Sequence, residues 1–257
     1  MTRVAAVGDI HLAPGSEGLL RPAFDTLVGC ADVLLLAGDL TRHGTPEEAA
    51  VVAGEVRGLP VPVVAVLGNH DYQSDRQDEV ADVLREAGVS VLEGTSVRLD
   101  ADGDGTAVGV AGSKGFCGGF AGRCAGDFGE PEMKALVRAS RESAEGLRRA
   151  LDGLADGGCA VRIALTHFAP VPDTLAGEPL EIYPFLGSYL LAEAIDAAGA
   201  DLAVHGHAHH GTEHGMTEGG VLVRNVAMPV IGRAFAVYHL AAPRSGGTDP
   251  VRTGQQP

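Results

Sequence analysis

Five short apolar segments of this chain each end in residues of the kind that bind metal ions. Residues 33–37 are valine, leucine and alanine, and Gly38 and Asp39 follow them. This pattern is typical of a buried strand that delivers one carboxylate to the edge of a sheet. Segments that begin at residues 4, 63, 161 and 202 run in the same way into Asp, Asn or His. Such side chains rarely recur together at strand ends, so the five segments predict one shared metal centre.

Helix signals separate the first three of these strands. Thr45 is a good helix cap, Pro46 suits the first helical position, and two glutamates follow, which predicts a helix over residues 46–57. Apolar residues at helical spacing predict another helix over residues 18–28. This alternation of strand and helix favours a parallel sheet and therefore an α/β fold.

The period of the apolar residues predicts further elements along the chain. Helices are expected over residues 74–87, 131–154 and 188–198, the second with Met133 on its buried face. Strands are expected over residues 89–92, 97–99, 107–111, 221–226 and 234–240. Residues 100–105 consist of Asp, Ala and Gly and predict a solvated hairpin turn. A calcium loop is the alternative, but no glutamate stands at the required offset.

Length and charge limit the domain organisation and the partners. A chain of 257 residues suits one α/β domain that buries its own core. We expect this domain to span residues 1–242, followed by a flexible tail of Gly, Thr, Gln and Pro over residues 243–257. The formal net charge of -15 at pH 7 repels polyanions, which argues against extended nucleic-acid binding.

The cysteines and the hydropathy of the chain indicate the cellular compartment in which we expect the protein. The cysteines are Cys30, Cys117, Cys124 and Cys159. They form no CxxC pair, which favours free thiols in a reducing compartment over extracellular disulfides. No apolar run reaches the roughly 18 to 20 residues that cross a bilayer, and the N-terminus enters a strand directly instead of a cleavable leader. These features predict a cytoplasmic protein without membrane association.

The candidate ligands have spacings that suit divalent metals. Asp9 and His11 are two residues apart, so in an extended segment both side chains leave the same face and can bind one ion. His207 and His209 repeat this spacing, and Asp39 carries two oxygens that can bind two different ions. Mixed carboxylate and imidazole ligands suit Mn, Fe, Zn, Co or Ni better than calcium. Two such ions, about 3.5 to 4 Å apart, would activate a bridging hydroxide for in-line displacement at phosphorus.

Five blocks of the sequence resemble the signature blocks of the calcineurin-like metallophosphoesterases. They are, in order, Gly8-Asp9-Ile10-His11, Gly38-Asp39, Gly68-Asn69-His70-Asp71, Thr166-His167 and Gly206-His207-Ala208-His209. The blocks extend over residues 8–209, which is most of the chain. The resemblance implies a four-layer α/β/β/α sandwich, with two mixed sheets flanked by helices and a dinuclear metal site at the carboxyl ends of the strands.

The resemblance also implies roles for individual residues. One ion would be held by Asp9, His11 and His209 and the other by Asn69, His167 and His207, with Asp39 bridging the two. His70 would not be a ligand but the acid that stabilises the transition state or protonates the leaving alkoxide. Asp71 would hold the His70 imidazole. Histidine suits the acid role because it exchanges protons near neutral pH.

Other polar residues are candidates for substrate contacts. The glycine-dense segment over residues 112–129 predicts a mobile loop beside the site, from which Lys114 and Arg123 would meet phosphate oxygens. His210 directly follows a candidate ligand and would also reach the substrate. The alternative for these groups is an ordinary solvated surface position. For His205 we expect a packed, supporting role in preference to direct ligation.

These features predict a metal-dependent phosphoesterase, a hydrolase that acts on a small phosphorylated substrate. The compact domain and His70 resemble the phosphodiesterase branch of the family, which favours diesters, including cyclic nucleotides, with manganese as the first metal to test. A phosphomonoesterase and a nuclease of the same fold are the enzymatic alternatives, and the acidic composition argues against the nuclease. A non-catalytic metal-binding scaffold is the alternative from another class. Such proteins typically lack the acid histidine or some ligands, and none is missing here.

Overall fold

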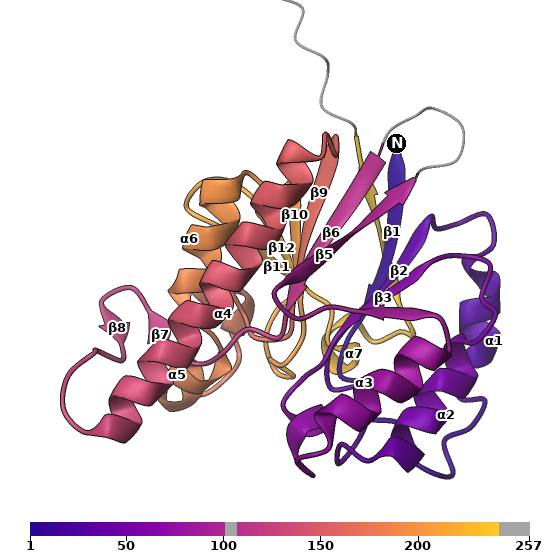
Figure 1. The fold of residues 1–257 in the computed structure, drawn as a ribbon, viewed down its shortest axis with the longest axis horizontal. Helices are drawn as coiled ribbons and strands as arrows, with labels where there is room; N and C mark the ends of the chain where they lie inside the picture. Colours follow the sequence, from indigo (N-terminus) through magenta and orange to yellow (C-terminus); the bar gives the residue numbers. More distant parts are fainter. Residues whose placement is uncertain (101–106, 242–257) are drawn as a thin grey trace, which may run out of the picture.

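The computed structural model describes residues 1–100 and 107–241. The expected turn over residues 100–105, apart from its first residue, and the expected tail over residues 243–257 lie outside these ranges. Within the described residues, two large mixed sheets stack face to face, and helices cover the outer face of each sheet (Figure 1). The predicted α/β/β/α sandwich is therefore confirmed.

The first sheet carries the amino-terminal candidate ligands. Its strand order within the described residues is β13-β1-β2-β3-β4, and all neighbours are parallel except β13 and β1. The strands are β1 (Thr2–Val7), β2 (Val33–Ala37), β3 (Val63–Val66), β4 (Val89–Val91) and β13 (Ala236–Leu240). Because β1, β2 and β3 are parallel neighbours, the loops that follow them leave the same edge of the sheet.

The second sheet carries the remaining candidate ligands. Its strand order, in the part of the chain that the structure describes, is β11-β12-β10-β9-β6-β5. The strands are β5 (Thr95–Asp100), β6 (Ala107–Ser113), β9 (Val161–Thr166), β10 (Leu202–His205), β11 (His214–Met216) and β12 (Leu222–Asn225). The central pairs are parallel and both edge pairs are antiparallel. The sequence did not predict β11, because this short edge strand contains a glycine and no apolar alternation.

Apolar side chains form three layers of core. Val4 and Ala6 of β1 face the other sheet, whereas Ala5 and Val7 face the helices, because successive strand residues point to opposite faces. The layer between the two sheets also contains Leu35, Val64, Val66, Val110, Ile163, Leu165 and Val204. Strands buried on both faces have continuous apolar sequences, which is why the pattern of residues identified the central strands.

Helices form the two outer layers (Figure 1). Those on the first sheet are α1 (Arg21–Phe24), α2 (Pro46–Val56) and α3 (Gln77–Glu86), and those on the second are α4 (Pro131–Asp156) and α6 (Tyr189–Ala198). Thr45 caps α2 and Pro46 opens it, as predicted, and Glu48 completes a capping box with Thr45. Two short helices, α5 (Tyr183–Leu186) and α7 (Met228–Ile231), lie in connecting segments.

The helix expected over residues 18–28 is shorter than predicted. It consists of the single turn α1 followed by a 3₁₀ turn, η1 (Asp25–Leu27). The backbone amides of Gly18, Leu20 and Arg21 all donate to the buried carboxylate of Glu55. These contacts hold the preceding residues in a turn, so the helix begins only at Arg21.

Two other expectations differ from the structure. Met133 is 42% exposed, not buried. The buried residues of α4 begin at Val137, so its first turn extends beyond the core. The glycine-dense segment is not a plain loop, because it holds the end of β6 and a small hairpin of β7 (Gly119–Phe120) and β8 (Arg123–Cys124).

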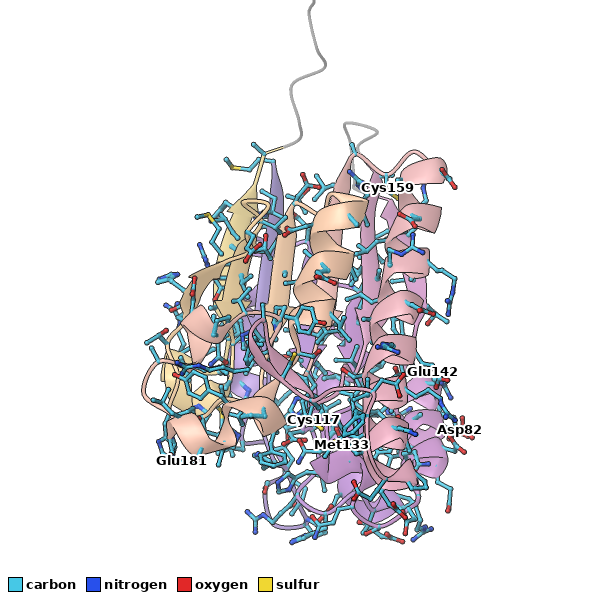
Figure 2. All side chains as sticks on the ribbon, turned by 90° about the vertical axis from the view of Figure 1, so that its left-hand side faces the viewer. Asp82, Cys117, Met133, Glu142, Cys159 and Glu181 are labelled. Atoms are coloured by element: carbon cyan, nitrogen blue, oxygen red, sulfur yellow. The ribbon has the colours of Figure 1, made fainter. Side chains whose placement is uncertain are left out.

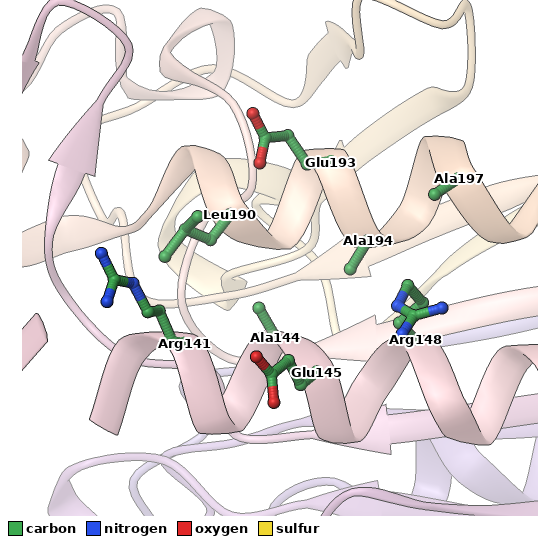
Figure 3. A pocket seen from close by; sticks show the side chains of 8 residues that line it. All are labelled: Arg141, Ala144, Glu145, Arg148, Leu190, Glu193, Ala194 and Ala197. Carbon is green, nitrogen blue, oxygen red and sulfur yellow. The ribbon is translucent and has the colours of Figure 1, made fainter. Parts of the chain in front are cut away.

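A shallow groove of about 390 Å³ follows the seam between α4 and α6 (Figure 3). Buried alanines, Ala144 of α4 and Ala194 of α6, let the two helices approach closely. Arg141, Arg148, Glu145 and Glu193 border the groove with charges of both signs. None of the lining residues is a candidate site residue, so this groove is separate from the predicted metal centre.

The cysteines are free thiols, as predicted. Figure 2 shows Cys159 at the end of the sandwich remote from Cys117, so this pair cannot form a disulfide. Among the described residues, no helix combines the length and the apolar character needed to span a bilayer.

Candidate metal centre

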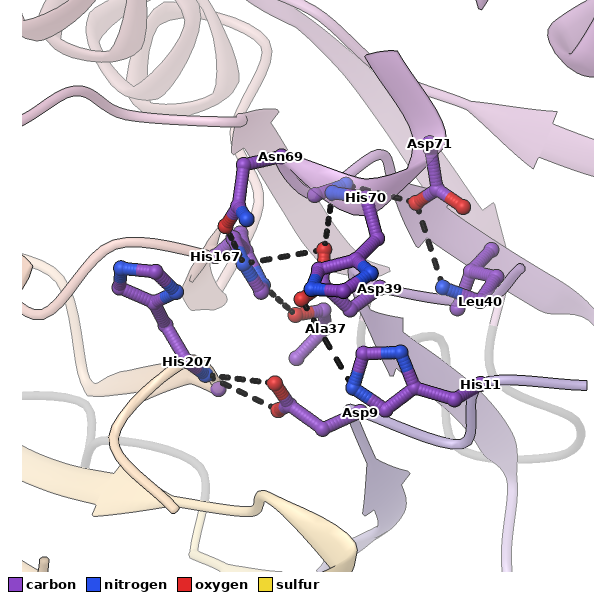
Figure 4. Close-up of polar contacts among 12 residues, drawn as sticks. Asp9, His11, Ala37, Asp39, Leu40, Asn69, His70, Asp71, His167 and His207 are labelled. Carbon is purple, nitrogen blue, oxygen red and sulfur yellow. Dashed lines mark hydrogen bonds and ion pairs between the residues drawn. The ribbon is translucent and has the colours of Figure 1, made fainter. Parts of the chain in front are cut away.

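The carboxyl ends of five strands bring the candidate ligands together between the two sheets (Figure 4). The potential ligand atoms form two groups, within each of which they lie no more than 4.8 Å apart. The first group is Asp9, His11, Asp39 and His209, and the second is Asp39, His167 and His207. Asp39 belongs to both groups, so its carboxylate lies where two neighbouring cations would meet.

Several candidate ligands have a strained backbone. The φ angles of Asp9, His11, Asp39 and His207 are 58°, 42°, 51° and 72°. Residues with a Cβ rarely adopt this left-handed region, and it costs about 1–3 kcal/mol for each residue. Such strain persists only where the surrounding structure enforces it. The fold therefore holds these four side chains in place against their local preference.

Glycines next to the ligands allow close approach of neighbouring segments. A Cβ atom at Gly68 would overlap the Asp39 carboxylate, and a Cβ atom at Gly206 would overlap the Asp9 carboxylate. Only glycine fits at these two positions without displacing a candidate ligand. The Gly-Asn-His and Gly-His-Ala-His blocks of the sequence thus contain glycine for a steric reason.

Direct contacts connect the residues of the first group. Nε2 of His209 lies 2.8 Å from Oδ1 of Asp9. The backbone amide of His207 donates to both Asp9 oxygens, at 3.1 and 2.9 Å. Nε2 of His11 lies 3.8 Å from Oδ2 of Asp39, and the His11 ring centroid is 5.4 Å from that of His209. Oxygen and nitrogen ligand atoms therefore surround one small space.

Backbone carbonyls orient the histidines of the second group. Nδ1 of His167 lies 2.9 Å from the carbonyl oxygen of Ala37, and it must donate because a carbonyl only accepts. Nε2 is then directed at the side-chain oxygens of Asn69, at 3.0 Å, and Asp39, at 3.3 Å. Nε2 of His207 similarly lies 3.3 Å from the Phe185 carbonyl oxygen, which leaves its Nδ1 available. Metal-binding histidines commonly donate their second ring N–H in this way.

Burial and charge make the centre suited to cations. Asp9 and Asp39 are each 1% exposed, and their ion-pair partners among the described residues are histidines. Burial lowers the pKa of His167 and of His207 to about 3, so both rings are neutral at pH 7. Burial also raises the pKa of Asp9 to about 6. His209 differs from these two histidines, because its hydrogen bond with Asp9 raises its pKa. Divalent cations would supply positive charge to the two buried carboxylates.

His70 lies at the edge of the first group. Its ring centroid is 4.6 Å from that of His11, and its backbone amide donates to Oδ1 of Asp39 at 2.8 Å. Nδ1 lies 2.7 Å from the carbonyl oxygen of Arg42, so Nδ1 carries a hydrogen. Nε2 is therefore the ring nitrogen available to exchange a proton with a substrate.

The expectation that Asp71 holds the His70 imidazole is wrong. Oδ1 of Asp71 accepts from the amide and the hydroxyl of Thr41, at 2.8 and 2.6 Å. Oδ2 accepts from the amides of Leu40 and Gly68, at 3.2 and 2.7 Å (Figure 4). The 3₁₀ turn η2 (His70–Tyr72) directs consecutive side chains to different sides, so residue 71 points away from residue 70. Asp71 instead ties the loop after β2 to the loop after β3.

Replacing Asp71 with asparagine is expected to lower the free energy of unfolding by about 3 kcal/mol. The amide keeps one acceptor oxygen but turns an NH₂ group toward backbone donors. Urea unfolding of the metal-free protein, followed by circular dichroism, measures the change. The control is Asp82→Asn, because the Asp82 side chain is 71% exposed and its surface ion pair contributes less than about 1 kcal/mol. Equal stability of the two variants would contradict the role assigned to Asp71.

The structure places the predicted substrate contacts at different distances from the centre. Lys114 is adjacent to it, because its carbonyl oxygen accepts from the amides of His167 and Phe168, each at 3.0 Å. Arg123 is exposed on β8, and His210 is exposed beside His209. Within the described residues, no hydrogen bond or ion pair joins the side chain of Arg123 or His210 to a candidate ligand. Their substrate roles stay predictions.

His205 lies outside both ligand groups. It is fully buried, with Nδ1 2.7 Å from the Gly206 carbonyl oxygen and Nε2 2.8 Å from the Thr174 hydroxyl. Burial lowers its pKa to about 4, so the ring is neutral at pH 7. These contacts agree with the expected supporting role beneath the loop that carries His207 and His209.

Sequence reasoning missed the carbonyls that orient the histidines. They belong to Ala37, Arg42 and Phe185. Every residue has a carbonyl, so no residue type marks these acceptors. The Phe185 carbonyl comes from α5, 22 residues before His207 in the sequence. Only the packing of α5 against the loop after β10 brings them together.

A four-layer sandwich with two ligand groups that share an aspartate fits a protein that binds two metal ions. A family model described as calcineurin-like phosphoesterase matches residues 2–211. The chain therefore belongs to the calcineurin-like phosphoesterase family.

Part of the chain is similar to a protein of Synechococcus sp. that is described as a probable cyclic nucleotide phosphodiesterase. The two are 32% identical over 87 residues, which cover 30% of this chain and 34% of that protein. The match thus spans about a third of the length of this curated relative.

Solved structures share the fold. Phosphopantetheinyl hydrolase from Mycobacterium tuberculosis matches with a TM-score of 0.64 and 18% identity over 89% of this chain and 90% of that one. A 5′-nucleotidase precursor from Thermus thermophilus matches with a TM-score of 0.50 and 17% identity over 87% of this chain and 48% of that one. At these identities the likeness concerns the fold alone.

Proposed function

We propose that this protein is a dinuclear phosphodiesterase in which Asp39 bridges two divalent metal ions. The observation that carries the proposal is that Asp39 belongs to both groups of potential ligand atoms. When bound, the two cations supply Lewis acidity and a hydroxide nucleophile for in-line attack at phosphorus. The metals that suit this donor set are Mn, Fe, Zn, Co and Ni, and manganese is the first to test.

The other ligands divide between the two ions according to their grouping. We assign Asp9, His11 and His209 to one ion and Asn69, His167 and His207 to the other. Neutral imidazoles and buried carboxylates are the forms that bind divalent cations, and the low pKa of His167 and His207 supports this assignment. The carbonyls that accept from these two histidines fix which ring nitrogen faces the ions.

His70 is the proposed general acid. Its Nδ1–H is held by the Arg42 carbonyl, so Nε2 presents or accepts the proton that moves during the reaction. Protonation of a leaving alkoxide by Nε2 removes the cost of expelling a strongly basic anion. Asp71 contributes indirectly, because it holds the loops that carry Asp39 and Asn69.

Diesters of small size, including cyclic nucleotides, are the proposed substrates. The partial similarity to the Synechococcus protein supports a phosphodiesterase activity. The net charge of -15 disfavours binding of a long nucleic acid, because each additional phosphate adds repulsion.

A comparison of two chromogenic substrates tests this function. Purified protein loaded with manganese is assayed with bis-4-nitrophenyl phosphate and with 4-nitrophenyl phosphate, and its metal content is measured by elemental analysis. We expect two metal ions per chain and a kcat/KM for the diester about tenfold above that for the monoester. A higher value for the monoester would identify a phosphomonoesterase. Turnover of neither substrate by the metal-loaded protein would favour a non-catalytic scaffold.

A further inference from the structure

A pocket of about 600 Å³ opens beside the candidate metal centre. Its walls come from η2, the loop after β4, the end of β6 and the middle of α4. The lining includes Tyr72, Glu93, Ser113, Lys114, Phe116 and Arg149. Glu142 marks the α4 side of the pocket in Figure 2. This volume is typical of a pocket that binds a small molecule.

The chain connects this pocket directly to the metal centre. Tyr72 is the last residue of η2, which begins at His70. The carbonyl of Lys114 accepts from the amide of His167, and the Phe168 ring centroid lies 4.5 Å from that of His207. The segment that carries His70 and the segment whose backbone contacts His167 therefore also form the wall of the pocket on the side of the metal centre.

The ammonium group of Lys114 is surrounded by aromatic rings. Its Nζ lies 4.8 Å from the ring centroid of Tyr72, 4.9 Å from that of Phe116 and 5.1 Å from that of Phe168. Ring faces stabilise a positive charge but do not replace the oxygen acceptors that an ammonium group has in water. Burial lowers the pKa of Lys114, which reflects this loss of water.

The carboxylate of Glu93 attracts the Lys114 ammonium, but it accepts its hydrogen bonds from other groups. Oε1 of Glu93 accepts from the Ser113 hydroxyl at 2.9 Å, and Oε2 accepts from the Lys114 backbone amide at 3.0 Å. Arg149, on the far wall, pairs with Glu145 at 3.8 Å. Among residues 1–100 and 107–241, no carboxylate forms an ion pair with Nζ and no carbonyl accepts a hydrogen bond from it. The ammonium group thus keeps its hydrogen-bonding capacity for a ligand.

We propose that Lys114 binds a second anionic group, a phosphate or a carboxylate, on the ester arm of the substrate. This inference rests on the proposed phosphodiesterase function and narrows its substrate class. The aromatic walls exclude water and so strengthen the contact between the ammonium and an anion. A substrate arm without an anionic group leaves the ammonium without an oxygen acceptor. Such a substrate is therefore expected to bind more weakly.

The test compares two diesters that differ by one phosphate. The substrates are thymidine 5′-(4-nitrophenyl phosphate) and the same compound carrying an additional 3′-phosphate, assayed with manganese-loaded protein. We expect the wild type to have the lower KM for the 3′-phosphorylated diester. Lys114→Met is expected to reduce this preference about tenfold through KM, and Lys114→Arg to restore much of it.

The other lysine of the chain provides the matched control. Lys134 is exposed on α4, and Lys134→Met is expected to keep the wild-type preference. An equal loss of kcat on both substrates in Lys114→Met would overturn the proposal, because it would place the ammonium at the reacting phosphoryl group. An unchanged preference with lower stability would also overturn it and leave Lys114 a packing role.

Direct binding separates this inference from the proposed function. If the wild type hydrolyses neither diester, the phosphodiesterase proposal fails, and calorimetry still tests the pocket. Thymidine 3′,5′-bisphosphate is expected to bind the manganese-loaded wild type about tenfold more tightly than thymidine 5′-monophosphate does. Lys114→Met is expected to remove that difference. Equal affinities for the two nucleotides in the wild type would refute the second-anion site.

Discussion

Asp39→Asn is expected to eliminate stoichiometric metal binding and to lower kcat by about 10³-fold or more. Asp39 is the residue common to both ligand groups, so its carboxylate is the one charge that both cations would share. An amide keeps the shape of the side chain but removes that negative charge and one lone-pair-bearing oxygen. Loss of one bridging ligand therefore weakens both ion sites at once. The measurements are metal content by elemental analysis and turnover of bis-4-nitrophenyl phosphate with manganese.

A surface carboxylate controls for the general effect of replacing Asp with Asn. Asp82 is on α3, and Asp82→Asn is expected to keep both the metal content and the turnover of the wild type. Circular dichroism checks that Asp39→Asn remains folded, which is expected because the asparagine oxygen can still accept from the His70 amide, whereas Asp71 accepts from four donors. The bridging role would be refuted by a folded Asp39→Asn protein that retains two metal ions and turns over within tenfold of wild type.

His70→Gln is expected to keep the bound metal and to lower kcat by about 10²-fold to 10³-fold. His70 lies beside His11 but contributes to neither ligand group, so its removal leaves the cation ligands intact. If Nε2 protonates the leaving group, the loss depends on how basic that group is. The effect is expected to be larger for a diester with an alkyl alcohol as leaving group than for one that releases 4-nitrophenolate. Kinetics on such a pair, together with elemental analysis, measure this difference.

The control for this variant is a histidine away from the centre. His239 is exposed on β13, and His239→Gln is expected to leave kcat and metal content unchanged. The general-acid role would be ruled out by an equal loss of kcat for good and poor leaving groups. Loss of metal from His70→Gln would instead show that the imidazole is a ligand.

The central strands, which alternate with helices, were predictable because a strand that is buried on both faces has a continuous apolar sequence. Residues 33–37 and 63–66 are buried throughout, so their runs of Val, Leu and Ala identified β2 and β3. The edge strand β11 was not predictable, because it is mostly exposed and its sequence carries little hydrophobic constraint. The late start of α1 and the exposure of Met133 likewise depend on contacts or helix position that a local pattern does not contain.

The gathering of the candidate ligands was predictable for a related reason. Parallel neighbouring strands end at the same edge, so polar residues that follow apolar runs are brought together by the topology. The contacts of Asp71 were not predictable from the sequence. Several donors were possible partners of its carboxylate, and the geometry of η2 determines which of them it contacts. The same limit applies to the pocket around Lys114, which four separate segments enclose.

The sequence by itself determined which residue types stand at the strand ends and that the strands are buried, because both follow from local pattern and from the chemistry of single side chains. Only the tertiary structure decided that the Arg42 carbonyl holds His70, that the Phe185 carbonyl orients His207, and that Lys114 stands among three rings. These contacts join residues far apart in the chain through backbone groups and ring faces, and such partners carry no signature in the order of amino acids.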